Sequence, residues 1–251
     1  MSGFVVVIPA RYASERLPGK PLRLIAGRTM IEHVYACARA SEADETIIAT
    51  DDRRIADAAR RFGADVCMTS GHHNSGTERL AEVCSERRWA GTQRVINLQG
   101  DEPLMPPELI NQCAELLEDP DVDVSTLASP LRSEADFRSP NVVKVVRSEI
   151  GDALYFSRAA IPHARETVNT ALAMESALHH HGIYGYRAAI LQRLVAAQAS
   201  PLEVCERLEQ LRALSLGMTI RVGLPGRRPG PGVDTEADLL AVEAHMGKVQ
   251  Q

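Results

Sequence analysis

The sequence RVINLQGDEP, from Arg94 to Pro103, joins a short apolar run to an acidic turn. The apolar first half has the length and composition of a buried strand. Gly100 and Pro103 end it, because neither residue fits well inside a paired ladder. We therefore expect Asp101 and Glu102 at the carboxyl end of a strand, where open α/β sheets bind their ligands. Such an acidic pair can hold a divalent cation, transfer a proton or be a solvated turn, and the stretch alone leaves all three open.

Strand-like and helix-like segments alternate around this turn. Short apolar runs predict strands, and apolar residues at helical spacing predict helices. The predicted strands are 4–8, 46–49, 66–68, 94–98 and 121–129, and the predicted helices are 30–40, 53–62, a segment from 75, and 107–117. This alternation predicts an α/β fold, a parallel, doubly wound sheet with helices on both faces.

Beyond Pro130 the alternation lapses. Strands are predicted at 142–146, 154–157 and 219–223, and one helix is predicted at 201–216. The last helix begins near Thr235 and Asp238, which have the spacing of a capping box. Asp234 then lies just outside the helix N-terminus, where its side chain is free to point elsewhere.

Length and composition favour an ordinary soluble globular protein. The 251 residues are 45% hydrophobic and 24% charged, which suits one α/β domain or two small ones. The net charge of −5 offers no basic field for nucleic acid. No apolar run approaches the roughly 20 residues that span a membrane, and the first residues lack a signal-peptide pattern.

The cysteines favour a reducing, cytoplasmic location. They are Cys37, Cys67, Cys84, Cys113 and Cys205, an odd number with no Cys-x-x-Cys pair. Several lie among apolar neighbours, so we expect free, buried thiols.

A cationic loop follows the first predicted strand. Within 10–21 it carries Arg11, Arg16 and Lys20 against a single acid. Arginine forks and lysine ammonium groups bind the oxygens of a polyphosphate, although the same residues also make a basic surface loop. The loop has neither the GxGxxG nor the GxxxxGK[ST] pattern, which disfavours a dinucleotide fold and a P-loop ATPase.

Three other polar stretches are open to a structural or a functional interpretation. Ser75-Gly76-Thr77 suits a nucleobase edge or a ribose, and suits a plain helix N-cap equally well. The adjacent His72 and His73 are predicted to be a solvated loop. Asp121-x-Asp123 imitates a metal-binding motif but precedes a strand, so we predict a solvated turn.

Together these segments resemble one family, the CMP-Kdo synthetases, or 3-deoxy-manno-octulosonate cytidylyltransferases. The resemblance follows the family order over nearly the whole chain and is carried by IPARYAS with RLPGKPL (8–22), SGTER (75–79), QGDEP (99–103), ALYFSRA (153–159), GIYGYR (182–187), LEQLR (208–212) and GVDT (232–235). Each motif alone is weakly specific, and the ordered set is very specific.

The resemblance implies a Rossmann-like mixed sheet of the nucleotide-diphospho-sugar transferase type. It implies a reaction of CTP with 3-deoxy-D-manno-octulosonate (Kdo) that gives CMP-Kdo and pyrophosphate for lipopolysaccharide biosynthesis. Mg²⁺ as cofactor and a homodimer are implied as well. On this interpretation residues 1–251 are one domain, with a nucleotide-binding half to about 130, an acceptor-binding and dimerisation half over about 131–222, and a metal-ligand loop and helix at 223–251.

The resemblance also assigns roles to residues. Asp101 and Asp234 would hold magnesium and, with Arg11 and Lys20, form the catalytic group. The nucleotide would meet Arg11, Ser14, Lys20, Ser75, Gly76, Gln99 and Asp101, and the sugar acid would meet Arg158, His180, Tyr184, Glu209 and Gln210. Glu102 would support the turn.

Some positions depart from the family pattern. An acid is expected at His72, a glutamine at Asn74 and an aromatic residue at His163, and the segment 166–178 matches weakly. The alternatives are a cytidylyltransferase for another acidic keto-sugar (amino-Kdo or sialic acid), a metal-dependent glycosyltransferase on a related fold, and a non-catalytic nucleotide sensor.

Overall fold

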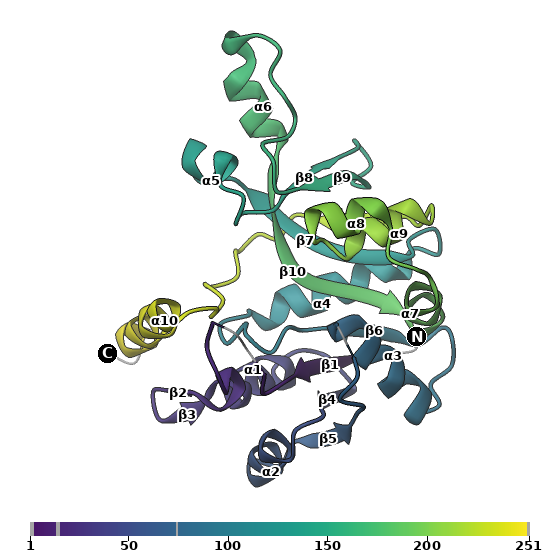
Figure 1. The fold of residues 1–251 in the computed structure, drawn as a ribbon, viewed down its shortest axis with the longest axis vertical. Coiled ribbons are helices and arrows are strands. Elements are labelled where there is room, and N and C mark those ends of the chain that lie inside the picture. Colours follow the sequence, from purple (N-terminus) through teal and green to yellow (C-terminus); the bar gives the residue numbers. More distant parts are fainter. Residues whose placement is uncertain (1–2, 14–15, 74, 250–251) are drawn as a thin grey trace.

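The computed structural model describes residues 3–13, 16–73 and 75–249, and within these ranges nine strands form one mixed sheet (Figure 1). The strand order is β11-β7-β10-β6-β1-β4-β5, and β8 pairs with both β10 and β9. The pairs β6–β1, β1–β4, β4–β5 and β11–β7 are parallel, whereas β10 runs antiparallel to β6, β7 and β8. The predicted α/β class is confirmed.

The strands of this sheet are β1 (Phe4–Ala10), β4 (Glu45–Thr50), β5 (Asp65–Met68), β6 (Arg94–Asn97), β7 (Val124–Pro130), β8 (Lys144–Arg147), β9 (Ala153–Ser157), β10 (Leu178–Arg187) and β11 (Ile220–Gly223). A separate small hairpin joins β2 (Leu24–Ile25) to β3 (Arg28–Thr29).

The α-helices are α1 (Met30–Arg39), α2 (Arg53–Arg61), α3 (Gly76–Glu86), α4 (Pro107–Glu115), α5 (Glu134–Arg138), α6 (Thr170–Ser176), α7 (Ala188–Ala196), α8 (Pro201–Glu206), α9 (Gln210–Ser215) and α10 (Glu236–Val249). Single 3-10 turns lie at Lys20–Leu22, Leu116–Glu118 and Thr167–Asn169. In the described part of the chain, no helix is both long and apolar enough to cross a membrane.

Helices cover both faces of the sheet, and strand β1 shows why. Val5 and Val7 join a core cluster with residues of α3, α7 and α9, whereas Val6 and Ile8 join a second cluster with residues of α1, α2 and α4. Successive side chains of a strand point to opposite faces, so a continuous apolar strand must be covered on both.

The prediction of a single helix at 201–216 is wrong. The segment is divided into α8 and α9 because Arg207 adopts the left-handed conformation with φ of 53°. Neither the leucine spacing nor the composition marks this break, because arginine ordinarily propagates a helix. The break lets Glu209 precede a new helix and point into the cavity described below.

Two polar stretches differ from the predicted solvated surface. His73 is only 19% exposed at its side chain, and its Nε2 lies 2.5 Å from an oxygen of Glu82. Asp123 accepts a hydrogen bond of 3.0 Å from the backbone N–H of Thr219 and so joins β7 to the start of β11. Each partner comes from another element, so sequence neighbours give no sign of it.

The C-terminal segment returns to the N-terminal half. After β11 the chain crosses the open end of the sheet and ends in α10 beside the β2–β3 hairpin (Figure 1). Val233, Leu239 and Val242 form a small core with Leu17, Ile25 and Met30. The predicted capping box is confirmed, because Thr235 and Asp238 exchange hydrogen bonds at the start of α10.

Candidate functional site

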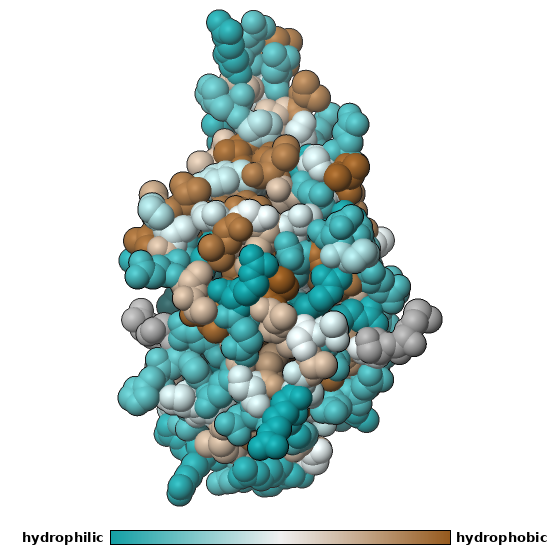
Figure 2. Space-filling view, turned by 90° about the vertical axis from the view of Figure 1, so that its right-hand side faces the viewer, coloured by the Kyte–Doolittle hydropathy of each residue, from teal (hydrophilic) through white to brown (hydrophobic). Residues whose placement is uncertain are grey.

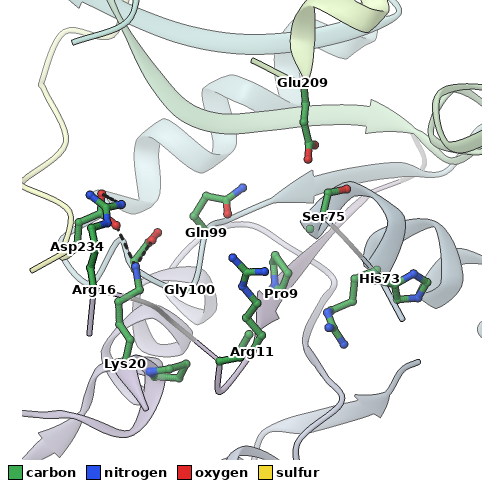
Figure 3. Close-up of a pocket in the computed structure, with 16 residues that line it drawn as sticks. Pro9, Arg11, Arg16, Lys20, His73, Ser75, Gln99, Gly100, Glu209 and Asp234 are labelled. Atoms are coloured by element: carbon green, nitrogen blue, oxygen red, sulfur yellow. Dashed lines mark hydrogen bonds and ion pairs between the residues drawn. The ribbon is translucent and has the colours of Figure 1, made fainter. Parts of the chain in front are cut away.

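A cavity of about 830 Å³ opens at the carboxyl ends of β1 and β6 (Figure 3). It is the place at which the sequence predicted a ligand. The residues that line it are Pro9, Ala10, Arg11, Ala13, Arg16, Lys20, Pro21, His73, Ser75, Gly76, Arg79, Gln99, Gly100, Asp101, Glu209 and Asp234.

Lys20 joins the two carboxylates that were predicted to act together. Its Nζ lies 2.6 Å from an oxygen of Asp101 and 3.1 Å from an oxygen of Asp234, and it also donates to the carbonyl of Val233 at 3.0 Å. Arg16 approaches the second oxygen of Asp234 at 3.0 Å. Asp101 and Asp234 are thus brought together although 133 positions separate them (234 − 101).

The charges around Lys20 are strongly coupled. Burial alone would lower the pKa of this ammonium group, but Asp101 and Asp234 outweigh burial and hold its pKa above the ordinary value. The lysine therefore stays positively charged at neutral pH. Both carboxylates share the ammonium group of Lys20, so this site brings positive charge next to its acidic side chains.

Glu102 is not among the described residues that line this cavity, and its carboxyl group lies against the C-terminal segment. A Cβ placed on Gly232 would lie 3.0 Å from Oε1 of Glu102, so the carboxyl group packs directly on that glycine. Burial, followed by the nearby charges of Asp101 and Asp234, raises the pKa of Glu102 to about 8. The raised pKa favours the protonated carboxyl group in the folded protein, and the role of Glu102 in supporting the turn stays a prediction.

This protonation predicts a pH dependence of stability in the absence of divalent cations. The folded pKa of about 8 exceeds the ordinary value of 4.5, so the stability that Glu102 contributes is complete below pH 4.5 and is lost as the pH rises through about 8. Urea unfolding in EDTA should show the stability of wild type falling relative to Glu102→Gln across this interval. Parallel stability curves for the two proteins would contradict the assignment.

The floor of the cavity is made of closely packed backbone. A Cβ on Gly100 would lie 2.8 Å from the carbonyl oxygen of Pro9, and one on Gly76 would lie 3.2 Å from Cγ of Pro9. Glycine is therefore required where the turn after β6 approaches the end of β1.

Gly100→Ala should destabilise the protein by about 1–3 kcal/mol, because the added methyl group must displace backbone. Thermal unfolding should show a midpoint several degrees below wild type. Gly226→Ala is the matched control, since a Cβ there would meet nothing within 4 Å. Equal midpoints for the two variants would argue against the close approach.

The start of α3 supplies the opposite wall. Ser75 caps the helix by accepting from the N–H of Glu78 at 3.3 Å, and it also lines the cavity. The N-cap interpretation is confirmed, and contact with a nucleotide stays a prediction. Gly76 and Gln99 also line the cavity, and their contacts with a nucleotide stay predictions. Ser14 lies outside the described residues.

Two ionisable lining residues were missed by the sequence analysis, namely His73 and Arg79. The side chain of Arg79 is 5% exposed and lies 3.1 Å from Asp51. Ser75 and Arg79 are four positions apart and share one face of α3, which is the signal that could have found the arginine. His73 gave no such signal, because Glu82 holds it from a separate part of the chain.

The residues that were predicted to bind the sugar acid lie in several different environments. Glu209 reaches into the cavity from the side facing Arg11 and accepts from Thr77 Oγ1 at 2.7 Å (Figure 3). Gln210 instead lines a small neighbouring cavity, and its buried Nε2 has no hydrogen-bond partner among the described residues.

His180, Tyr184 and Arg158 are set back from the described lining of the main cavity. His180 hydrogen-bonds Thr126 at 3.0 Å and packs on the Tyr184 ring, and burial lowers the pKa of His180 to about 3. Arg158 donates to the carbonyl oxygens of Glu206 at 2.8 Å and Pro140 at 3.1 Å. These three predicted contacts with the sugar stay predictions.

Known proteins are similar to this chain in sequence and in fold. A family profile described as Cytidylyltransferase matches residues 5–220. The 3-deoxy-manno-octulosonate cytidylyltransferase of Marinobacter nauticus is 50% identical over 98% of this chain and 97% of its own length. The protein of the same name from Thioalkalivibrio sulfidiphilus is 48% identical over 96% and 97%.

A solved structure agrees with these relatives. It is named as CMP:2-keto-3-deoxy-manno-octonic acid synthetase complexed with CTP, and it matches with a TM-score of 0.90 and 42% identity over 98% of this chain and 99% of that chain. Sequence, fold and cavity therefore agree, and the chain belongs to the 3-deoxy-manno-octulosonate cytidylyltransferase family.

Proposed function

We propose that this protein transfers the cytidylyl group of CTP to Kdo, giving CMP-Kdo and pyrophosphate. The observation that carries the proposal is the cavity in which Arg11, Arg16 and Lys20 face Asp101 and Asp234. Three cations suit a triphosphate, and two carboxylates that share a cation suit a metal bound to it. The names of the relatives support CTP and Kdo as the substrates.

The reaction makes one bond and breaks one bond at the α-phosphorus. The anomeric oxygen of the sugar attacks phosphorus, the bond from phosphorus to the bridging oxygen of the β-phosphate breaks, pyrophosphate leaves, and the hydroxyl proton passes to solvent water. Negative charge grows on the departing pyrophosphate, so catalysis depends mainly on positioning and on positive charge. Arg11 and Lys20 supply that charge, and Gln99, Ser75 and Gly76 orient the nucleotide.

We infer that Mg²⁺ is the cofactor and that Asp101 and Asp234 hold it. Their oxygens lie within 3.1 Å of one cationic nitrogen, so one cation can contact both, and carboxylate oxygens are the ligands that Mg²⁺ prefers. When bound, Mg²⁺ would neutralise phosphate charge and favour ionisation of the attacking hydroxyl.

The acceptor half and the dimer are inferred from the upper part of the molecule. There α6 extends beyond β8 and β9 at the top of the view (Figure 1), and Figure 2 shows apolar residues gathered in the upper half of the view. Leu154, Val168, Leu172 and Val204 are each more than 60% exposed, which suits burial against a second copy. Sedimentation equilibrium should then give twice the mass of the chain.

The test of the reaction is release of pyrophosphate from CTP, Mg²⁺ and Kdo by the purified protein. We expect release only when all three are present. A panel with amino-Kdo and sialic acid in place of Kdo identifies the acceptor, because each keeps the carboxylate and the keto-sugar. Absence of pyrophosphate with every acceptor would overturn the proposal.

A further inference from the structure

Tyr12 ties together the two ends of the cationic loop. The N–H of Gly19 donates to the carbonyl of Tyr12 at 3.2 Å. A Cβ on Gly19 would lie 3.1 Å from the Tyr12 hydroxyl oxygen and 3.2 Å from its Cζ, so the ring packs directly on this glycine. Gly19 also has a φ of 68°, which glycine adopts without strain. The position of Tyr12 therefore fixes the backbone of Gly19, from which Lys20 directly follows.

Arg54 stacks on the Tyr12 ring. The guanidinium carbon lies 3.4 Å from the ring centroid, in the geometry of a cation–π contact. Asp52 holds the guanidinium through Nε at 3.0 Å and Nη2 at 2.7 Å. The same carboxylate accepts from the N–H of Arg54 at 2.9 Å and caps α2. The N-terminus of α2 thus holds the guanidinium plane of Arg54, on which the Tyr12 ring lies.

The cations of the loop face one cavity. Arg11, Arg16 and Lys20 all line it, and Arg16 and Lys20 are paired with Asp234. A loop that is already ordered loses less conformational entropy when a polyphosphate binds, so fixing its ends increases affinity without a new contact to the ligand. Arg54 can act in this way from a position away from the described lining of the cavity.

We propose that Arg54 is a positioning residue for triphosphate binding, acting through Tyr12 and Gly19 on Lys20. This inference rests on the proposed function and extends it to a residue in α2. The stack affects substrate binding and leaves the transfer step itself unchanged.

Arg54→Ala should raise the KM for CTP about two- to fivefold and leave kcat unchanged, the size expected for loss of one exposed cation–π contact. Arg53→Ala is the matched control, because it removes the same charge from the adjacent position of the same helix. It should match wild type. Arg54→Lys keeps a cation over the ring and should recover part of the affinity.

A double-mutant cycle separates the stack from other effects of the arginine. In a Tyr12→Leu background, Arg54→Ala should have little further effect on the KM for CTP, whereas Tyr12→Phe keeps an aromatic face and should keep the sensitivity to Arg54→Ala. Equal KM values for Arg53→Ala and Arg54→Ala, or additive effects of Tyr12→Leu and Arg54→Ala, would overturn the proposal.

CTP affinity measured by calorimetry distinguishes this inference from the proposed reaction. If CTP binds with the expected order of affinities but no pyrophosphate forms, the reaction is wrong and the stack stands. If wild type turns over CTP and all variants match it, the stack is wrong and the reaction stands. Absence of CTP binding to wild type overturns both.

Discussion

Asp101→Asn should lower turnover by about 10² to 10³, the loss typical of removing one electrostatic anchor from a transition state. Asparagine has the shape of aspartate but carries no charge, so it still approaches Lys20 and binds a divalent cation weakly. The site would keep its shape and lose half of its carboxylate pair. Steady-state pyrophosphate release at saturating CTP measures the effect.

Two controls belong with this experiment. Asp234→Asn should reproduce the loss, because the two carboxylates share one cation at 2.6 Å and 3.1 Å. Asp121→Asn removes an exposed acid far from the cavity and should leave turnover at the wild-type level. Unchanged turnover in Asp101→Asn, with unchanged thermal stability, would remove Asp101 from the metal site.

Lys20→Ala should lower kcat/KM for CTP by about 10- to 100-fold, mainly through KM, as expected for loss of a charge-assisted hydrogen bond. It removes the ammonium group that we propose binds the phosphates and that contacts both Asp101 and Asp234. The remaining carboxylates then repel one another and the incoming triphosphate. Calorimetric CTP affinity and steady-state rates together separate binding from turnover.

The control for Lys20 is a variant that keeps its charge. Lys20→Arg should retain more affinity than Lys20→Ala, although the wider guanidinium cannot reach Asp101, Asp234 and the Val233 carbonyl in the same way. Normal CTP affinity and rate in Lys20→Ala would count against the assignment of the cationic loop to the triphosphate.

The parts of the fold that depend on local pattern could be predicted from sequence. β1 is a continuous apolar run, β4 and β6 each contain a short apolar run, and the turn at Gly100 follows β6. Both the parallel core and the edge that carries the cavity were therefore predictable. Strand β10 was not predicted as a strand, because its histidines and glycines give no alternation. Its pairing with three other strands depends on contacts distant in sequence.

The residues of the candidate site also divide into those that local sequence could predict and those that it could not. Asp101 could be found from its own neighbours, whereas its partner Asp234 came only from the resemblance to a family, because no spacing rule joins residues so far apart. Arg79 and His73 were missed since their positions depend on Asp51 and Glu82 from other elements. The break at Arg207 was missed because a left-handed arginine has no sequence signature.

The return of the C-terminal segment gives the site an order of assembly during translation. A ribosome delivers the N-terminal half first, and the strands, the cationic loop and Asp101 can emerge while Asp234 is still unsynthesised. The core shared by Leu17, Ile25 and Met30 with Val233 and Leu239 can close only afterwards. Most of the residues that line the cavity, Asp101 among them, are therefore synthesised before Asp234, which is the last of them along the chain.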